Sequence, residues 1–129
     1  MRPLIAIVDD DESVREALRS FFKSISLQTE LFACAQDFLD SSHLGDMSCL
    51  ILDVLMPGMD GLELQRQLAA RLLIPIIFIA GQADQTVRDT AMRAGAIGFL
   101  AKPFSEEILL KAVRTALESR GGGGHSRFQ

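Results

Sequence analysis

The chain has 129 residues, of which 48% are hydrophobic and 23% are charged, and its formal net charge is −4 at pH 7. This length suits one domain with a packed core, and the composition excludes a disordered chain. No apolar run approaches the roughly 20 residues that a membrane helix needs, and the absence of a basic cluster argues against direct nucleic-acid binding. We therefore expect a cytoplasmic globular domain that spans no membrane.

Five short apolar segments predict the strands of a sheet. They are residues 4–8, 27–32, 49–53, 76–80 and 98–101. Four of them are almost continuously apolar, which is typical of parallel strands that are covered on both faces. The segment 27–32 alternates apolar and polar residues, so we expect it to be an edge strand with one wetter side.

Helical patterns separate these strands and follow the last one. Apolar stripes predict helices over residues 14–25, 35–41, 62–72, 87–94 and 108–117. Gly95 is a suitable end for the fourth helix, and Ser105 is a suitable N-cap for the fifth. A strand followed by a helix, five times over, predicts a doubly wound α/β sheet.

Two features outside this pattern have plain interpretations. The final residues GGGGHSRFQ are too rich in glycine and polar residues for a core, so we expect residues 120–129 to form a flexible tail or a truncated linker. Cys34 and Cys49 lack the spacing of a metal site, and we expect both to be small buried hydrophobic residues.

Polar residues gather at the carboxyl ends of the predicted strands. Asp9 and Asp10 follow the first strand, Asp53 ends the third, and Lys102 follows the fifth. Ligands of open parallel sheets bind at this edge, so we expect the four residues to share a pocket. Three carboxylates beside one ammonium favour the entry of a cation, and oxygen ligands suit Mg²⁺. A carboxylate in such a pocket can attack a phosphoryl group, which makes Asp53 a candidate phosphoryl acceptor.

Each of these residues also has a simpler explanation. Asp10 and Asp11 could cap the following helix, and this is the role that we expect for Asp11. Asp53 could begin a turn, and Lys102 could be a solvated surface residue. Capping does not explain acids after two separate strands, so the coincidence favours a shared pocket.

Three motifs in order resemble the receiver domain of two-component response regulators: IVDDD, LDVLMPGMDG and GAIGFLAKPF. The resemblance covers residues 3–119, and the wording is most similar to receivers that precede a helix-turn-helix module in transcription regulators of the nitrogen-fixation type. It implies a flavodoxin-like (βα)5 fold, with a doubly wound parallel sheet in the strand order 2-1-3-4-5.

The resemblance also implies a phosphorelay role for individual residues. Asp53 would accept a phosphoryl group from a sensor histidine kinase, so the domain would act as a switch for an output domain or partner and not as an enzyme. Mg²⁺ would bind Asp10, Asp53 and the main-chain carbonyl of Leu55, with Asp9 acting mostly through water. Lys102 would pair with a phosphoryl oxygen.

The switch of the family uses an aromatic residue and a hydroxyl. Phe99 matches the aromatic position, but Ala80 stands where the family has Thr or Ser and cannot donate a hydrogen bond to a phosphoryl oxygen. Gly81 leaves room for a phosphate, and the bond before Pro103 is expected to be cis. The signalling face would be residues 85–119, which would also form a homodimer interface. It stays open whether Ala80 makes this a constitutive interaction module that is uncoupled from phosphorylation.

Two other functions share part of the pattern. A hydrolase of the haloacid dehalogenase kind uses an Asp nucleophile, but it needs a second acid two residues later, where this chain has Leu55. A flavodoxin-like cofactor carrier needs hydroxyls and glycines after the first strand, whereas DDDES would repel a phosphate in the absence of a metal. Both patterns fit less well than that of a phosphoryl acceptor.

Overall fold

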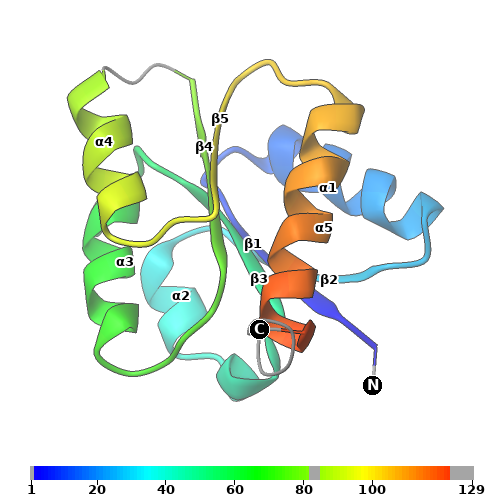
Figure 1. The fold of residues 1–129 in the computed structure, drawn as a ribbon, viewed down its shortest axis with the longest axis horizontal. Helices are drawn as coiled ribbons and strands as arrows, with labels where there is room; N and C mark the ends of the chain where they lie inside the picture. Colours follow the sequence, from blue (N-terminus) through cyan, green and yellow to red (C-terminus); the bar gives the residue numbers. More distant parts are fainter. Residues whose placement is uncertain (1, 82–84, 123–129) are drawn as a thin grey trace.

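The computed structural model describes residues 2–81 and 85–122 of the chain. A five-stranded parallel sheet forms the centre of the molecule (Figure 1). Its strands are β1 (Leu4–Val8), β2 (Gln28–Phe32), β3 (Cys49–Asp53), β4 (Ile76–Ala80) and β5 (Gly98–Ala101). Their order is β2-β1-β3-β4-β5 and every pair is parallel, which confirms the expected topology.

Burial along the strands follows their place in the sheet. All residues of β3 and β4 are buried, because each strand has neighbours on both sides and helices on both faces. Strand β2 is an edge, as predicted, and only Phe32 is buried in it. Strand β5 is the other edge, where Phe99 and Leu100 are half-buried and Ala101 is exposed. The expectation that β5 is covered on both faces therefore holds only in part: Phe99 packs against one core and Leu100 against the other, but neither is fully buried.

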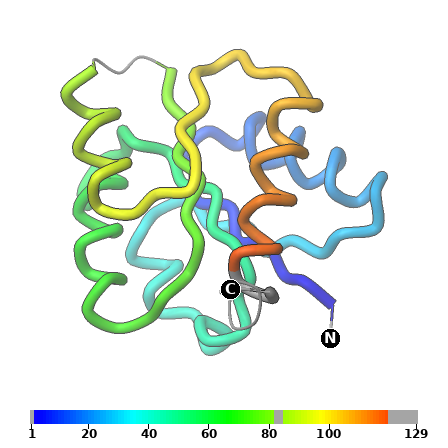
Figure 2. Tube along the Cα trace, in the orientation of Figure 1, coloured from blue at the N-terminus to red at the C-terminus, as the bar shows by residue number. Residues whose placement is uncertain are grey.

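The helices form two layers, one on each side of the sheet (Figures 1 and 2). They are α1 (Glu12–Ser24), α2 (Ala35–Leu39), the 3₁₀ turn η1 (Leu44–Asp46), α3 (Gly61–Ala69), α4 (Gln85–Arg93) and α5 (Glu106–Gly122). Helices α2, α3 and α4 cover one face, and α1 and α5 cover the other. Because successive strand residues point to opposite faces, Ile7 packs in the α1–α5 core and Val8 in the core of the other layer. In the described part of the chain, no helix is both long and apolar enough to cross a bilayer.

Short side chains fix where two of the helices begin. The carboxylate of Asp11 accepts a hydrogen bond from the main-chain N–H of Ser13 at 2.9 Å, which is the helix-capping role expected for Asp11. The hydroxyl of Ser105 accepts one from the main-chain N–H of Ile108 at 3.1 Å, at the start of α5. Both contacts are local in the chain, and for this reason the sequence alone could predict them.

Apart from shifts of one or two residues at other element ends, the structure differs from the expected elements in three places. The turn η1 was not predicted, because a single 3₁₀ turn has no apolar period. Helix α3 ends at Ala69, before Leu72, since the chain must turn toward Pro75 and β4. Helix α5 continues to Gly122, past the expected domain end at residue 119. The remainder of the expected tail, residues 123–129, lies outside the described residues.

The two cysteines differ in burial. Cys49 is fully buried in β3, and burial raises the pKa of its thiol to about 12. Cys34 is only half-buried, so the expectation of a buried residue was wrong there: it precedes α2 at the end of the exposed edge strand. Both are free thiols.

Besides its two edge strands, the sheet has a carboxyl edge, where its strands end, and an amino edge, where they begin. All five strands point the same way, so their carboxyl ends meet at one edge. Helix α5 runs back along the sheet, so the start of β1 and the end of α5 both lie at the opposite, amino edge (Figure 1).

Candidate functional site

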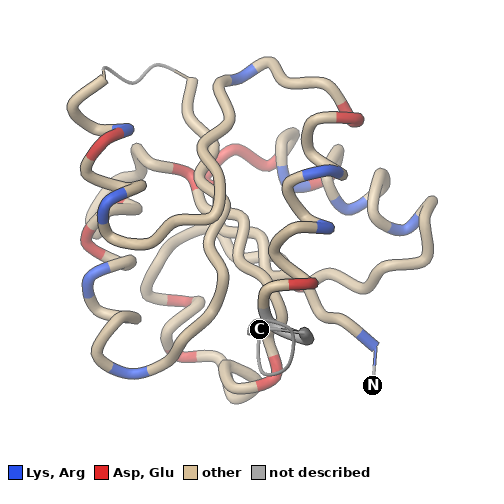
Figure 3. Tube along the Cα trace, in the orientation of Figure 1, with Lys and Arg blue, Asp and Glu red and all other residues tan. Residues whose placement is uncertain are grey.

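Three acids come together at the carboxyl edge of the sheet. Asp9 and Asp10 follow β1, and Asp53 is the last residue of the adjacent β3. One carboxylate oxygen of each residue lies within 4.8 Å of the corresponding oxygens of the other two. Figure 3 shows the run of acidic residues between β1 and α1 at this edge. The structure thus brings together the acids that the sequence singled out.

Asp9 is completely buried, and hydrogen bonds hold it on several sides. Its Oδ1 atom accepts a hydrogen bond from the main-chain N–H of Asp11 at 2.8 Å, and its Oδ2 atom accepts one from Nζ of Lys102 at 3.1 Å. Its main-chain oxygen accepts a hydrogen bond from the guanidinium of Arg15 at 2.7 Å. Asp9 therefore provides a fixed carboxylate group at the base of the site.

Asp10 presents the opposite situation one residue later. It is exposed, and within residues 2–81 and 85–122 no hydrogen bond or ion pair reaches its carboxylate. Its oxygens are therefore open to a ligand that arrives from solvent.

Asp53 is also buried, but the ammonium of Lys102 lies farther from its carboxylate than from that of Asp9. Burial is the main reason that its pKa is raised to about 6, and the charge of Asp9 adds to the effect. Nζ of Lys102 lies 3.8 Å from Oδ1 of Asp53 and lowers the pKa only in part. A site with three oxygen donors and an excess of negative charge fits a hard divalent cation such as Mg²⁺.

Lys102 enters the site from the end of β5. Its main-chain N–H donates to the oxygen of Ala80 at 2.7 Å, which extends the pairing of β4 with β5 by one residue. Its ammonium is closer to Asp9 than to Asp53, at 3.1 Å against 3.8 Å. The peptide bond between Lys102 and Pro103 is cis.

The loop between β3 and α3 passes close over the backbone of Asp53. A Cβ atom at Gly61 would lie 2.5 Å from the main-chain oxygen of Asp53, so only glycine fits at the start of α3. The N–H of Gly61 donates to the oxygen of Val54 at 2.9 Å. Within this loop the main-chain N–H of Leu55 lowers the pKa of Asp53, while the Leu55 side chain is 64% exposed.

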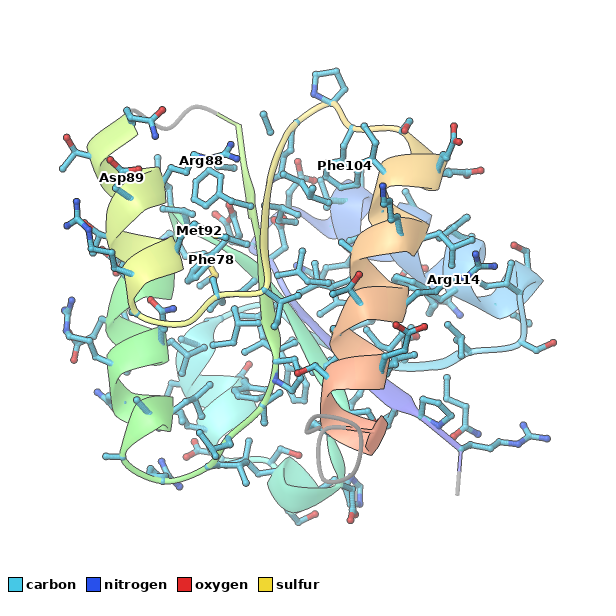
Figure 4. The ribbon with its side chains drawn as sticks, viewed as in Figure 1. Phe78, Arg88, Asp89, Met92, Phe104 and Arg114 are labelled. Atoms are coloured by element: carbon cyan, nitrogen blue, oxygen red, sulfur yellow. The ribbon has the colours of Figure 1, made fainter. Side chains whose placement is uncertain are left out.

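The positions that the switch would use lie at the ends of β4 and β5. Ala80 is buried and offers no hydroxyl, whereas Gly81 is exposed and has open space around it. Phe99 is half-buried, with its ring centroid 6.1 Å from that of Phe78. The guanidinium of Arg88 reaches from α4 toward the sheet and lies 5.8 Å from the Phe99 ring (Figure 4).

Sequence reasoning missed one residue of the site. Arg15 belongs to α1, and its side chain turns back to the main chain of Asp9. A single arginine in an amphipathic helix is usually a solvated residue, so no pattern in the sequence distinguished it. The half-buried side chain beside the acid cluster became visible only in the structure.

Comparison with known proteins identifies the family. Residues 5–114 match the family model of the response regulator receiver domain. The chain belongs to this family. The strand order and the acidic pocket at the carboxyl edge agree with that assignment.

Response regulators are also the relatives of this receiver domain. It is 51% identical over 116 residues to the response regulator protein TmoT of Ectopseudomonas mendocina, covering 89% of this chain and 53% of TmoT. It is 38% identical over 114 residues to the transcriptional regulatory protein FixJ of Azorhizobium caulinodans, covering 88% of this chain and 54% of FixJ. The low-resolution structure of the response regulator StyR superposes with a TM-score of 0.87 at 45% identity, over 98% of this chain and 65% of StyR. The receiver domain thus spans about half the length of the curated relatives that it matches.

Proposed function

We propose that this receiver domain accepts a phosphoryl group on Asp53 from the phosphohistidine of a sensor histidine kinase, in a reaction that requires Mg²⁺. The observation that carries the proposal is the convergence of Asp9, Asp10 and Lys102 on the buried carboxylate of Asp53. With a pKa of about 6, Asp53 is mostly ionised at neutral pH and can act as a nucleophile.

The transfer replaces one bond to phosphorus by another. An oxygen of Asp53 attacks the phosphorus atom, the new O–P bond forms, and the N–P bond to the kinase histidine breaks with its electron pair returning to the imidazole nitrogen. Mg²⁺, when bound, neutralises charge on the acids and on the phosphoryl oxygens. Lys102 would bind one of these oxygens, and its distance of 3.8 Å from Oδ1 of Asp53 supports this role.

The hydrogen bonds of the acids support different roles in holding the ion. Asp10 and Asp53 would bind Mg²⁺ directly, together with the main-chain carbonyl of Leu55. Both carboxylate oxygens of Asp9 already accept hydrogen bonds from the protein, so Asp9 would act mostly through water. This division matches the preference of Mg²⁺ for few carboxylates and several waters.

Phosphorylation by a small donor tests the proposal. Incubation with acetyl phosphate and Mg²⁺ should add one phosphoryl group to the wild-type protein, as measured by intact-protein mass spectrometry. Asp53→Asn should add none, and chelation of the metal should abolish the reaction. Asp11→Asn is the matched control, since Asp11 caps α1 within the same acidic run, and it should still be modified. Labelling that persists in Asp53→Asn would refute the proposed acceptor.

The output is proposed from the relatives. FixJ is named a transcriptional regulatory protein, and the relatives are about twice as long as this chain. We infer that the domain regulates a partner or attached domain that acts in transcription. The surface proposed for this contact, or for a homodimer, is α4–β5–α5, whose exposed charges include Arg88, Arg93, Lys111 and Arg114.

Ala80 favours a second candidate function. A hydrogen bond to a charged acceptor contributes about 1.5–3 kcal/mol, and alanine cannot supply it. Without this contribution the modification would lose most of its influence on the signalling surface. In this version the domain is a constitutive interaction module whose phosphorylation chemistry is intact.

A further inference from the structure

Arg15 holds the segment that carries the first two acids of the site. Its Nη1 atom donates a hydrogen bond to the main-chain oxygen of Asp9 at 2.7 Å. Arg15 is half-buried in α1, which begins at Glu12, so the helix fixes the base of the side chain. The oxygen that it binds belongs to the peptide between Asp9 and Asp10. The contact therefore fixes the orientation of the peptide plane from which the side chain of Asp10 departs.

The other described hydrogen bonds of Asp9 involve its N–H and its carboxylate, and not its main-chain oxygen. The main-chain N–H of Asp9 donates to the oxygen of Phe32 at 3.1 Å, and the Asp9 carboxylate is held by Asp11 and Lys102. In the part of the chain that the structure describes, Arg15 is the donor to the Asp9 carbonyl, and no hydrogen bond restrains the carboxylate of Asp10. The direction of Asp10 thus depends on the backbone that Arg15 holds.

We propose that Arg15 is a positioning residue of the metal site, which clamps the Asp9–Asp10 peptide and thereby directs the Asp10 carboxylate toward Asp53. The inference rests on the proposed function, because it assigns Arg15 to the Mg²⁺ site of that function. Groups that orient metal ligands without touching the metal commonly change metal affinity by roughly 10–100-fold when they are removed.

Because Arg15 is charged, the direction in which its removal changes Mg²⁺ affinity distinguishes two explanations of its role. A guanidinium near a cation site repels the cation, so a purely electrostatic role predicts that its removal strengthens Mg²⁺ binding. A clamping role predicts the reverse, because the removal lets Asp10 swing away from Asp53. The two explanations therefore lead to opposite changes in affinity.

Calorimetric titration with Mg²⁺ alone separates them. Arg15→Met, which keeps the length of the stem and removes the charge, should bind Mg²⁺ about tenfold more weakly than wild type. Arg15→Lys keeps the charge and a donor but not the planar fork, and its affinity should fall between the two. Arg19→Met is the matched control, since Arg19 lies one turn along α1 and pairs with Glu16, and its affinity should equal that of wild type. Affinity in Arg15→Met that is equal to or tighter than that of wild type would overturn the proposal.

A second measurement does not depend on the metal. The main-chain N–H of Asp11 donates a hydrogen bond to the Asp9 carboxylate, so its protection depends on how firmly Asp9 is held. In the metal-free protein, amide hydrogen exchange at Asp11, followed by NMR, should therefore be about tenfold faster in Arg15→Met than in wild type. Unchanged exchange at Asp11 would show that Arg15 does not hold the segment. If wild-type protein took up no Mg²⁺, the proposed function would fail on its own, while the exchange rates would still decide whether the clamp exists.

Discussion

At position 53, the negative charge that the proposed phosphoryl acceptor needs lowers the stability of the fold. Burial and the neighbouring charge of Asp9 raise the pKa of Asp53 to about 6 from an ordinary value of 3.8. The folded state therefore holds a proton at Asp53 more tightly than the unfolded state does. The stabilisation that this provides is complete below pH 3.8 and is lost as the pH rises through about 6.

Removal of this charge should stabilise the metal-free protein at neutral pH. A rise of about two pKa units corresponds to roughly 2–3 kcal/mol, so Asp53→Asn should be more stable than wild type by about that amount at pH 7 and by little at pH 4. Urea unfolding in the presence of a chelator measures the difference at each pH. Asp37→Asn, an exposed acid in α2, is the control and should show no comparable rise. A constant difference across this range would contradict the argument.

At position 80, a single missing hydroxyl separates the two candidate functions. Ala80→Thr should supply the hydroxyl that couples the phosphorylation site to the proposed signalling surface. Beryllofluoride with Mg²⁺ should then cause larger NMR shifts in α4 and β5 of this variant than in wild type. Ala80→Val is the matched control, because valine has nearly the same shape as threonine but no donor. Equal responses in the Val and Thr variants would show that volume at this buried position, and not the hydroxyl, governs the response.

Among the α-helices, α4 has the fewest buried apolar residues. Only Ala91 is buried in it, and the buried Gln65 of α3 donates from Nε2 to the oxygen of Ala91 at 3.1 Å. Figure 4 shows Arg88 and Met92 on this helix and Phe78 of the adjacent strand. A buried amide thus links α3 to the C-terminal half of α4, which belongs to the proposed signalling surface.

Substitution of Gln65 should reveal this link as a loss of stability. Gln65→Ala removes the hydrogen bond and buried volume and should lower the free energy of unfolding by about 1–3 kcal/mol. Gln65→Leu should be nearly neutral, because it replaces the amide by apolar volume and the Ala91 oxygen also accepts from the N–H of Ala96. Chemical denaturation measures both, and Gln67→Ala, on the same helix, should change little. A loss in Gln65→Leu as large as in Gln65→Ala would mean that the hydrogen bond dominates.

For the molecule as a whole, the sequence predicted what is local or periodic. Strand positions follow from short apolar runs, and the caps at Asp11 and Ser105 depend on neighbours three residues away or fewer. The shared pocket could be anticipated because parallel strands place their carboxyl ends at one edge. The strand order, in contrast, came from the family resemblance and not from periodicity.

The contacts that sequence reasoning could not supply connect distant or ordinary-looking groups. Lys102 reaches Asp9 across 93 positions of the chain, and its preference for Asp9 over Asp53 depends on side-chain geometry that no pattern encodes. Arg15 binds a carbonyl, a partner that every residue offers. Gln65 is a polar residue inside a leucine-rich helix, and only the packing of α3 against α4 shows why it is buried.

The start of β1 and the end of α5 both lie at the amino edge of the sheet, and this has a consequence for larger architectures. A second folded unit joined directly before β1 or after α5 would be attached at the pole opposite the acids (Figure 1). The point of attachment itself would lie away from the mouth of the pocket. Such a unit could meet the proposed signalling surface only by reaching along the length of α5 toward α4 and β5.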